Sequence, residues 1–488
     1  MRLVLKDIRS NREMTPDNCL LGCTGCIRLL ADLRYNIRKT DRLLYSELIL
    51  PPGYEGMIMN FRLGELFCGA GGLAWGAFHA GLEHPIEQNG ERYSISHSWA
   101  NDLDRSACRT YAANLLLKGI DDKTEIDKAI TDTEGWRKLL SSASEQRIPS
   151  VICDSVEELT KNAENLPDID GFAFGFPCND FSAVGERRGL DGEFGPLYTH
   201  GIKVLNAKRP RWFVAENVEG LLHRDKGRVR KQIEKELSEA GPGYVLTTQL
   251  YRFEEYGVPQ YRSRLVIVGI SLPDAAQGIT FHVPEPIMSR GFRSAKWAME
   301  HDPTQPDVFK PLTDTALNHT IKRAAEQVRR RLEHTLPGQN AWNENIPDDC
   351  ALHVKKAHLS MIYRRLVADE PSYTITGNGG GGTHGYHWDE ARALTNRERA
   401  RLQSFPDTYR FHGGDDSIRR QIGMAVPPLA ARVIFEAILK TYAGQSYPWV
   451  HPTTSGSAQR RRNEAPLTSA AHPQTELPLE RDELILTA

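Results

Sequence analysis

The chain has 488 residues, of which 40% are hydrophobic and 25% charged, so it is long enough to fold around its own core without disulfides or structural metals. Its 61 Lys and Arg against 63 Asp and Glu exclude a uniformly basic nucleic-acid coat but allow a local basic groove. No apolar stretch approaches the roughly 20 residues of a membrane helix. The charged N-terminus lacks a signal-peptide core, so we expect a cytoplasmic protein whose eight cysteines are reduced.

Residues 1–60 form no clear pattern and are assigned to an N-terminal extension. The extension holds a cysteine cluster, Cys19, Cys23 and Cys26, whose spacing is that of a radical-type iron–sulfur site and also suggests zinc. No second CxxC pair follows for zinc, and no barrel pattern follows for the radical type. We therefore expect no metal here, and we interpret His384 and His387 as loop histidines rather than ligands.

Strands and helices alternate from residue 62 to about 269. The predicted strands are 63–67, 97–102, 150–153, 171–176, 212–217 and 264–269, and the clearest predicted helices are 107–117 and 228–240. Short apolar strands that alternate with helices indicate a parallel sheet covered on both faces. The expected fold class is therefore α/β, with a doubly wound sheet.

The pattern changes after residue 271, where prolines and polar loops dominate. One helix is predicted at 316–335, and its five Lys or Arg against two Glu fit either phosphate contact or a solvated face. Regular order returns at 394–405 and 426–442. Residues 446–488 are rich in Ser, Thr, Pro and charge, which predicts a disordered tail.

A glycine-rich turn follows the first predicted strand. The segment LGELFCGAGGLAWG places Gly69, Gly71, Gly72 and Ala74 in the pattern G-x-G-x-x-G/A between a strand and a helix. Such a turn lets the backbone approach a ligand closely. Asp102 ends the next strand, where a carboxylate can accept two ribose hydroxyls. The pair suggests a nucleoside ligand, although a tight structural turn explains the motif on its own.

A cysteine follows the fourth predicted strand in GFPCNDFS. At the carboxyl end of a strand, Cys178 can act as a nucleophile if it is ionised, or it can be a small buried hydrophobe. The loop after it has four glycines with Arg187 and Arg188, which suits a lid that closes on an anion. Glu216 and Asn217 end the following strand. Arg262 and Arg264 then occupy alternate positions and are expected to point the same way.

These segments resemble the C5-cytosine-specific DNA methyltransferase family of bacterial type, whether paired with a restriction enzyme or orphan. The matching segments are LFCGAGG, GFPCNDFS, ENVEGL and QYRSRL, and the stretch from EPSYTIT through LTNRERARLQSFPDTY to QIGMAVPP. They occur in the family's order. The resemblance implies a Rossmann-like methyltransferase sheet domain and a smaller target-recognition domain. Their residues would be 61–271 plus 415–445 for the sheet domain and 272–414 for the smaller one.

By the same resemblance, the cofactor is S-adenosyl-L-methionine and no metal is needed. The residues implied to hold the cofactor are Glu65, Phe67, Gly69, Ala70, Gly72, Asp102, Leu103, Asp154, Gly175, Pro177, Leu197 and Met424. Three positions depart from the usual family pattern. Met424 replaces an asparagine, Leu103 replaces an aromatic residue, and Asn179 replaces a glutamine.

The resemblance also implies the catalytic roles. Cys178 matches the nucleophile that adds to C6 of cytosine, Glu216 matches the group that binds N3 and the 4-amino group, and Arg264 matches the donor to O2. Arg262 and Asn217 lie in the same motifs, with Asn217 supporting the backbone near Pro177. The target base must leave the DNA stack for this reaction. The expected DNA contacts are Ser182, Arg187, Arg188, Arg329, Arg330 and Arg331.

The expected partner is double-stranded DNA, modified by a monomer in the nucleoid, with a restriction endonuclease as a genetic rather than physical partner. Three alternatives remain open from the residues. The glycine turn alone fits a nicotinamide-dependent oxidoreductase, a non-catalytic DNA-binding module could keep the fold, and an RNA-directed member could share the motifs. The long region 272–392 favours DNA over RNA.

Overall fold

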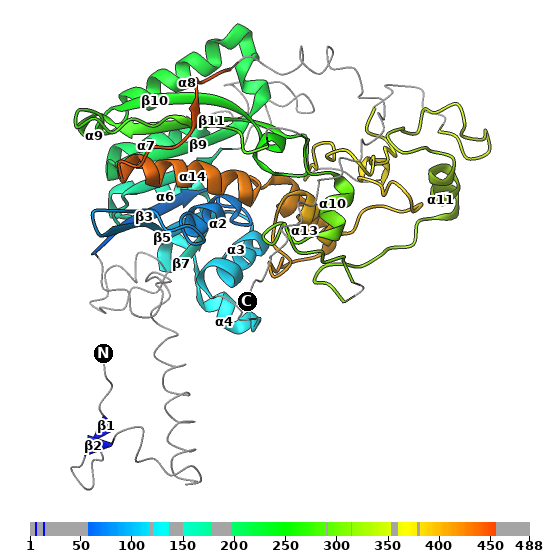
Figure 1. Cartoon of the computed structure of the whole chain (residues 1–488), viewed down its shortest axis with the longest axis horizontal. Coiled ribbons are helices and arrows are strands. Elements are labelled where there is room, and N and C mark those ends of the chain that lie inside the picture. The colour runs from blue at the N-terminus through cyan, green and yellow to red at the C-terminus, as the bar shows by residue number, and fades with distance from the viewer. Residues whose placement is uncertain are drawn as a thin grey trace, which may run out of the picture. The chain divides into compact units, whose positions relative to one another are not determined.

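A computed structural model of the chain describes residues 5–6, 13–14, 57–117, 121–135, 150–176, 197–288, 291–313, 315–352, 360–377 and 381–454. Within these ranges, nine strands form one sheet in the order β10-β11-β9-β8-β3-β5-β7-β6, with β4 paired to β5 (Figure 1). The strands are β3 (Met57–Leu66), β4 (Glu87–Gln88), β5 (Glu91–Asp102), β6 (Ile130–Thr131), β7 (Ser150–Cys153), β8 (Gly171–Gly175), β9 (Trp212–Val218), β10 (Tyr244–Arg252) and β11 (Ser263–Ser271).

The predicted α/β sheet is confirmed, but it is mixed rather than wholly parallel. Strands β6, β7, β5, β3, β8 and β9 pair in parallel, whereas β11 is antiparallel to both β9 and β10. The edge strand β10 was not predicted, because its central residues Thr247, Thr248 and Gln249 interrupt the apolar pattern of a buried strand.

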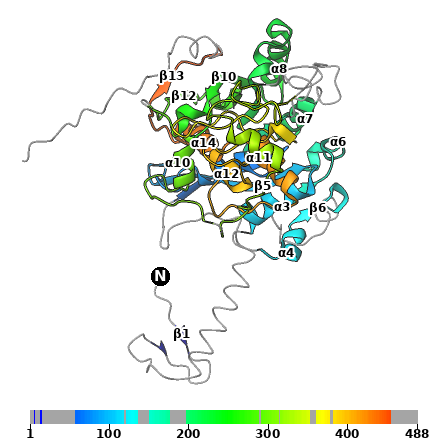
Figure 2. The ribbon, with the colours of Figure 1, turned by 90° about the vertical axis from the view of Figure 1, so that its right-hand side faces the viewer.

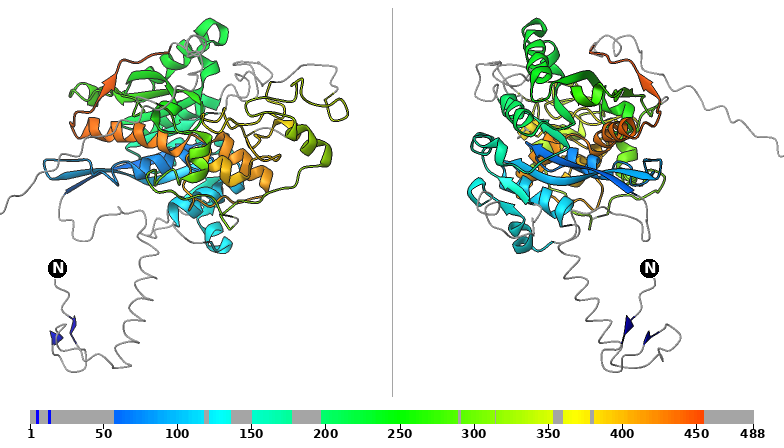
Figure 3. Two further views of the ribbon diagram at one scale, coloured as in Figure 1. Left: turned by 45° about the vertical axis from the view of Figure 1, so that its right-hand side comes forward. Right: turned by 90° about the vertical axis from the view of Figure 1, so that its left-hand side faces the viewer.

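Helices cover both faces of the sheet. One face carries α2 (Gly72–His79), α3 (Arg105–Tyr111), which continues into a π-helical turn (Ala112–Leu116), and α14 (Pro428–Tyr442). The other carries α6 (Val156–Thr160), α7 (Tyr198–Lys208) and α8 (Arg228–Glu239). Each layer buries its own apolar cluster against the strands, and Figure 3 shows the sheet between the two layers. This arrangement is the doubly wound architecture expected.

The C-terminal helix α14 packs directly on the glycine-rich helix α2. A Cβ atom on Gly72 would lie 2.1 Å from the carbonyl oxygen of Val426, and one on Gly76 would lie 2.5 Å from the Cβ of Ala431. Glycine is therefore required at both positions for this close approach. The stretch Asp415–Tyr442 is apolar enough to cross a membrane, but 72% of its most apolar window is buried inside the fold. Packing in the core accounts for its composition.

The region after β11 contains little regular structure. Its α-helices are α9 (Leu272–Ala275), α10 (Ala295–Glu300), α11 (Glu326–Glu333), α12 (Asn396–Leu402) and α13 (Asp415–Met424). In Figure 2, α10, α11 and α12 lie toward the viewer. The predicted helix at 316–335 was too long. The carbonyls of Leu317 and Asn318 accept hydrogen bonds from Arg397 on α12, so this backbone serves α12 instead of a helix of its own.

Two predicted boundaries were wrong. Strand β3 begins at Met57, inside the stretch assigned to the extension, because residues 57–62 pair with β5. The predicted tail is ordered as far as Thr454: β13 (Trp449–Val450) pairs with β12 (Val283–Pro284). In the extension, β1 (Leu5–Lys6) pairs with β2 (Glu13–Met14). The cysteine cluster at 19–26 and residues 455–488 lie outside the described residues.

Candidate active site

The glycine-rich turn is fixed by a carboxylate on the neighbouring strand. Asp102, the last residue of β5, accepts hydrogen bonds from the backbone N–H of Gly69 at 2.8 Å and of Asp104 at 2.9 Å. Phe67 and Gly69 have φ angles of 55° and 54°, so the chain turns sharply in the left-handed region. A Cβ on Gly69 would meet nothing within 4 Å among the described residues. The turn therefore leaves open space beside a half-buried carboxylate.

Buried polar side chains support the turn from below. Glu65 is 1% exposed, and burial raises its pKa well above the usual range. Tyr111 hydrogen bonds to Glu65, whereas the Glu65 Oε2 atom has no partner among the described residues. The hydroxyl of Tyr409 donates to the carbonyl oxygen of Ala70. The turn thus packs on buried polar side chains, and one oxygen among them, Glu65 Oε2, has no hydrogen-bond partner among the described residues.

Other predicted cofactor residues lie at the same edge of the sheet. Asp154 follows β7 and accepts hydrogen bonds from the N–H groups of Thr133 at 3.1 Å and Ser155 at 2.7 Å. Leu103 follows β5 and is 75% exposed, and Met424 ends α13 with 59% exposed. Because neither apolar side chain serves the core, both are available to a ligand. Leu197 is partly buried against the cluster under α7.

An ion pair joins the ends of β9 and β11. Arg264 Nε lies 2.9 Å from Glu216 Oε1, and both side chains are largely buried. Burial raises the pKa of Glu216, and the charges of Arg264 and Arg262 offset this only in part. Gly175 is paired with Glu216 on the adjacent strand β8, and a Cβ on Gly175 would lie 3.2 Å from Glu216 Oε2. A largely buried carboxyl of raised pKa therefore lies beside the end of β8.

Asn217 supports the backbone that leads out of β8. Its Nδ2 donates to the carbonyl oxygen of Phe176 at 3.2 Å, and its Oδ1 accepts from the N–H of Val218 at 2.8 Å. Phe176 is the residue before Pro177. The predicted nucleophile Cys178 lies outside the described residues, as do Pro177, Asn179, Ser182, Arg187 and Arg188.

Arg262 and Arg264 have different partners in the structure. The guanidinium of Arg262 is 1% exposed and donates to the carbonyl oxygens of Ile375 at 3.1 Å and of Gly423 and Ala425 at 3.0 Å each. These bonds fasten the start of β11 to the segment before residue 377 and to the end of α13. Arg262 is therefore a positioning residue, and the expectation that it shares the direct catalytic role of Arg264 needs this correction.

The three arginines of α11 that were predicted to contact DNA all bind other groups of the protein. Arg331 is 5% exposed, donates to the carbonyl oxygen of Cys350 at 2.7 Å and stacks over Tyr363, so its assignment as a phosphate contact was wrong. Arg329 pairs with Glu326 and Glu333, and Arg330 pairs with Asp349 at 2.7 Å. The last two arginines are partly exposed and remain predicted contacts.

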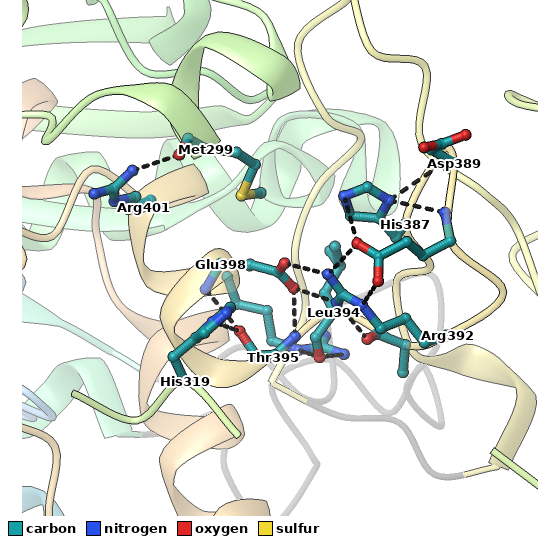
Figure 4. Close-up of polar contacts among 12 residues, drawn as sticks. Met299, His319, His387, Asp389, Arg392, Leu394, Thr395, Glu398 and Arg401 are labelled. Atoms are coloured by element: carbon teal, nitrogen blue, oxygen red, sulfur yellow. Dashed lines mark hydrogen bonds and ion pairs between the residues drawn. The ribbon is translucent and has the colours of Figure 1, made fainter. Parts of the chain in front are cut away.

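A buried charge network holds the loop around residue 387 on α12 (Figure 4). Glu398 accepts two hydrogen bonds from Arg392, at 2.9 and 2.8 Å, and one from the N–H of Thr395 at 2.7 Å. His387 Nδ1 accepts from the N–H groups of Asp389 and Glu390. The imidazole of His387 thus caps a turn, which agrees with its interpretation as a loop histidine.

The comparisons with known proteins decide the family. The sequence profile described as C-5 cytosine-specific DNA methylase matches residues 61–139 and 130–440. The chain belongs to this family. It is 47% identical over 396 residues to the Type II methyltransferase M.BbvI of Brevibacillus brevis, covering 80% of this chain and 94% of that relative. It is 36% identical over 380 residues to the Type II methyltransferase M.NgoFVII of Neisseria gonorrhoeae, covering 78% and 86%.

Among solved structures, this methylase is similar to the Dnmt2 methyltransferase of S. pombe, with a TM-score of 0.45 and 14% identity over 78% of this chain and 98% of that one.

Family membership overturns the oxidoreductase interpretation of the glycine turn. The description of the family gives DNA as the substrate class.

The sequence argument missed the buried residues that join the start of β11 to distant segments of this methylase. Gln260 and Gln403 are both fully buried and hydrogen bond to each other and to backbone groups of distant segments. Tyr111 and Tyr409, under the glycine turn, were missed as well. The two glutamines stand inside QYRSRL and ARLQSF, so a polar side chain within a motif was the available signal.

Proposed function

We propose that this methylase transfers a methyl group from S-adenosyl-L-methionine to C5 of a cytosine flipped out of double-stranded DNA, through a covalent bond between Cys178 and C6. The observation that carries the proposal is the pair formed by Glu216 and Arg264. It lies at the strand end beside Gly175, three residues before Cys178. A carboxyl of raised pKa and a guanidinium at this point complement the N3, amino and carbonyl edge of cytosine.

The residues at the glycine turn fit S-adenosyl-L-methionine. Open space at Gly69, the half-buried Asp102 carboxylate and the unpartnered Glu65 oxygen favour a ligand with hydroxyl and ammonium groups. Asp102 would bind the ribose hydroxyls, and the exposed Leu103 side chain would pack on the adenine. The remaining implied cofactor residues, such as Asp154 and Met424, belong to the same proposal. When bound, this cofactor supplies an electrophilic methyl group.

The protein's own residues then activate the base. The Cys178 thiolate adds to C6, which breaks the aromaticity of the ring and makes C5 enamine-like. Glu216 binds N3 and the 4-amino group and stabilises the charge that develops there, while Arg264 donates to O2. After transfer, removal of the C5 proton and expulsion of the Cys178 thiolate restore the ring. Asn217 keeps the backbone before Pro177 in place throughout.

We further propose that residues 272–414 read the DNA sequence, while residues 61–271 and 415–445 carry the chemistry. The catalytic side chains described above all come from the sheet domain, and the smaller part is joined to it by Arg262 and Gln260. Phosphate contacts position a duplex without choosing bases, which we assign to Arg329 and Arg330. Because M.BbvI and M.NgoFVII are named Type II methyltransferases, we place this methylase in a restriction-modification system.

The covalent step can be tested with duplex DNA that carries 5-fluorocytosine at the methylated position. Fluorine replaces the C5 proton, so the adduct between protein and DNA cannot collapse after transfer. The wild type should form a denaturation-resistant complex in the presence of S-adenosyl-L-methionine, and Cys178→Ser should not. Cys350→Ser, at a buried cysteine elsewhere in the chain, is the matched control and should form the complex. Complex formation by Cys178→Ser would refute the proposal, and a wild type that binds DNA without methylating it would indicate a non-catalytic module.

A further inference from the structure

Two cysteines from different elements meet directly behind the proposed cofactor edge. Cys108 lies on α3, and Cys153 is the last residue of β7. The Sγ atom of Cys108 lies 3.6 Å from the carbonyl oxygen of Asp102, and that of Cys153 lies 3.8 Å from the carbonyl oxygen of Leu103. The two thiols also hydrogen bond to each other. Both sulfurs therefore lie against the same two consecutive residues of the strand end.

The two thiols differ in access and acidity. Cys108 is 0% exposed, whereas Cys153 is partly exposed. The hydrogen bond from Cys108 lowers the pKa of Cys153, with help from the nearby Arg105 charge, and the same interaction together with burial raises the pKa of Cys108. An accessible thiol of lowered pKa next to a second thiol is the arrangement of a reactive cysteine with its resolving partner.

The geometry points to Cys108 and Cys153 as a reversible disulfide site that switches off cofactor binding when the cell becomes oxidising. Neither thiol has a part in the proposed methyl transfer. In a reducing cytosol the pair is reduced, and disulfides that do form there are usually transient and regulatory. The inference rests on the proposed cofactor site, because its effect is exerted through Asp102 and Leu103.

The chemistry balances with a disulfide oxidant such as oxidised glutathione. The Cys153 thiolate attacks one sulfur of the oxidant and releases a glutathione thiolate. The Cys108 thiol loses its proton to solvent, attacks the Cys153 sulfur and releases the second glutathione. Two protein thiols are oxidised to one disulfide, and one glutathione disulfide is reduced to two thiols.

The new bond acts on the cofactor edge in two ways. First, it removes the thiol groups that donate to the carbonyl oxygens of Asp102 and Leu103. Second, it draws α3 and β7 together beside the end of β5, which contacts both sulfur atoms. Asp102 also holds the N–H of Gly69, so a displaced strand end disturbs the glycine turn. We expect S-adenosyl-L-methionine affinity to fall on the order of tenfold or more, because one lost hydrogen bond to a charged group is already sufficient.

The test uses the full-length protein and measures binding, because oxidation of Cys178 would confuse an activity assay. The protein is treated with oxidised glutathione, titrated with S-adenosyl-L-methionine in a calorimeter, reduced with dithiothreitol and titrated again. Digestion without reductant and mass spectrometry identify the linked peptides. The wild type should yield a peptide pair joined through Cys108 and Cys153 and should lose affinity reversibly.

Three variants complete the test. Cys153→Ser should keep its affinity after oxidation, Cys108→Ser should stop at a mixed disulfide between Cys153 and glutathione, and Cys350→Ser should respond like the wild type. Because Cys108 is fully buried, Cys153→Ser keeps the test valid if the other variant folds poorly. Absence of the linked peptide, or a linked protein with unchanged affinity, would overturn the inference. Failure of the reduced wild type to bind the cofactor would instead refute the proposed function, while peptide mapping still decides whether the disulfide forms.

Discussion

Gln260 and Gln403 are joined by a hydrogen bond of 3.0 Å between Nε2 and Oε1, although 143 residues separate them. Gln260 also binds both the carbonyl oxygen of Leu402 and the N–H of Ile375, and Gln403 donates to the carbonyl oxygen of Ile422 at 2.6 Å. Neither glutamine is exposed. The segment that leads into β11 is thereby tied to α12, to the segment before residue 377 and to α13.

Each single replacement of these glutamines should destabilise the fold by more than half of the loss that the double replacement causes. Gln403→Leu leaves buried polar groups of Gln260 and Ile422 unsatisfied, which should lower the free energy of unfolding by about 2–3 kcal/mol. The double variant Gln260→Leu/Gln403→Leu should lose less than the sum of the single variants, because both partners of one bond are removed. Urea denaturation measures the free energy of unfolding of the two single variants and the double variant, with Gln232→Leu, at an exposed position, as the control. If the loss in the double variant equals the sum of the two single losses, the two glutamines are not coupled.

Asp102→Asn should weaken S-adenosyl-L-methionine binding by about 1.5–3 kcal/mol, the contribution of hydrogen bonds to a charged group. The amide keeps the size of the side chain but cannot accept from both Gly69 and Asp104 and also from a ribose hydroxyl. Calorimetry measures the affinity. Asp122→Asn, which changes an aspartate that caps α4 (Lys123–Lys128), should leave the affinity unchanged. Equal affinities for the two variants would remove Asp102 from the cofactor site.

Glu398→Gln should lower stability by about 3 kcal/mol at pH 7, because it removes the buried one of the two carboxylates that pair with Arg392. Burial raises the pKa of Glu398, but hydrogen bonds and charge from Arg392 outweigh it, so the pKa is lowered. A lowered folded-state pKa stabilises the protein above the unfolded value of about 4.3, and this stability is lost as the pH falls through the folded value. The difference between wild type and variant should therefore shrink below about pH 4.

The matched control for this pair is Glu390→Gln. Glu390 binds the same Arg392 guanidinium, but its side chain is 53% exposed against 3% for Glu398. An exposed ion pair contributes about 1 kcal/mol or less, so this variant should be nearly as stable as the wild type. Urea denaturation between about pH 3 and pH 7 gives both curves. Equal losses for the two variants would show that burial of Glu398 is not what matters.

The arginines of α11 should separate into two classes. Arg329→Gln with Arg330→Gln should weaken binding to all duplexes alike and reduce the slope of log affinity against log salt by about 0.9 for each phosphate that the protein no longer neutralises. Arg331→Gln should instead lower stability, since its guanidinium is buried against Cys350 and Tyr363. Filter binding over a salt series and urea denaturation distinguish the two. An unchanged salt slope in the double variant would remove α11 from the DNA interface.

Exchange of residues 272–392 for the corresponding region of a relative should change which sequence is methylated. The arginine variants should leave that sequence unchanged, because phosphates are the same at every step. Mapping of 5-methylcytosine in treated DNA measures both. An unaltered site after the exchange would place sequence reading elsewhere in the chain.

The sequence by itself determined the alternation of strands and helices, the glycine turn after β3 and the motifs that identify the family. These features are local, since strand and helix periodicity and the backbone freedom of Gly69 act within a few residues. It also placed Glu216, Asn217 and Arg264 at strand ends, where a doubly wound fold presents its ligand-binding groups.

Only the tertiary structure decided what each charged side chain does. Arg262 and Arg264 are two residues apart and identical in type, yet one is buried against three carbonyls and the other faces Glu216. In the same way, Arg331 is buried in the region where Arg329 and Arg330 are partly exposed. The partners that make this difference lie up to 163 residues away in the sequence. A charge's role depends on its burial and its partners, which no local pattern specifies.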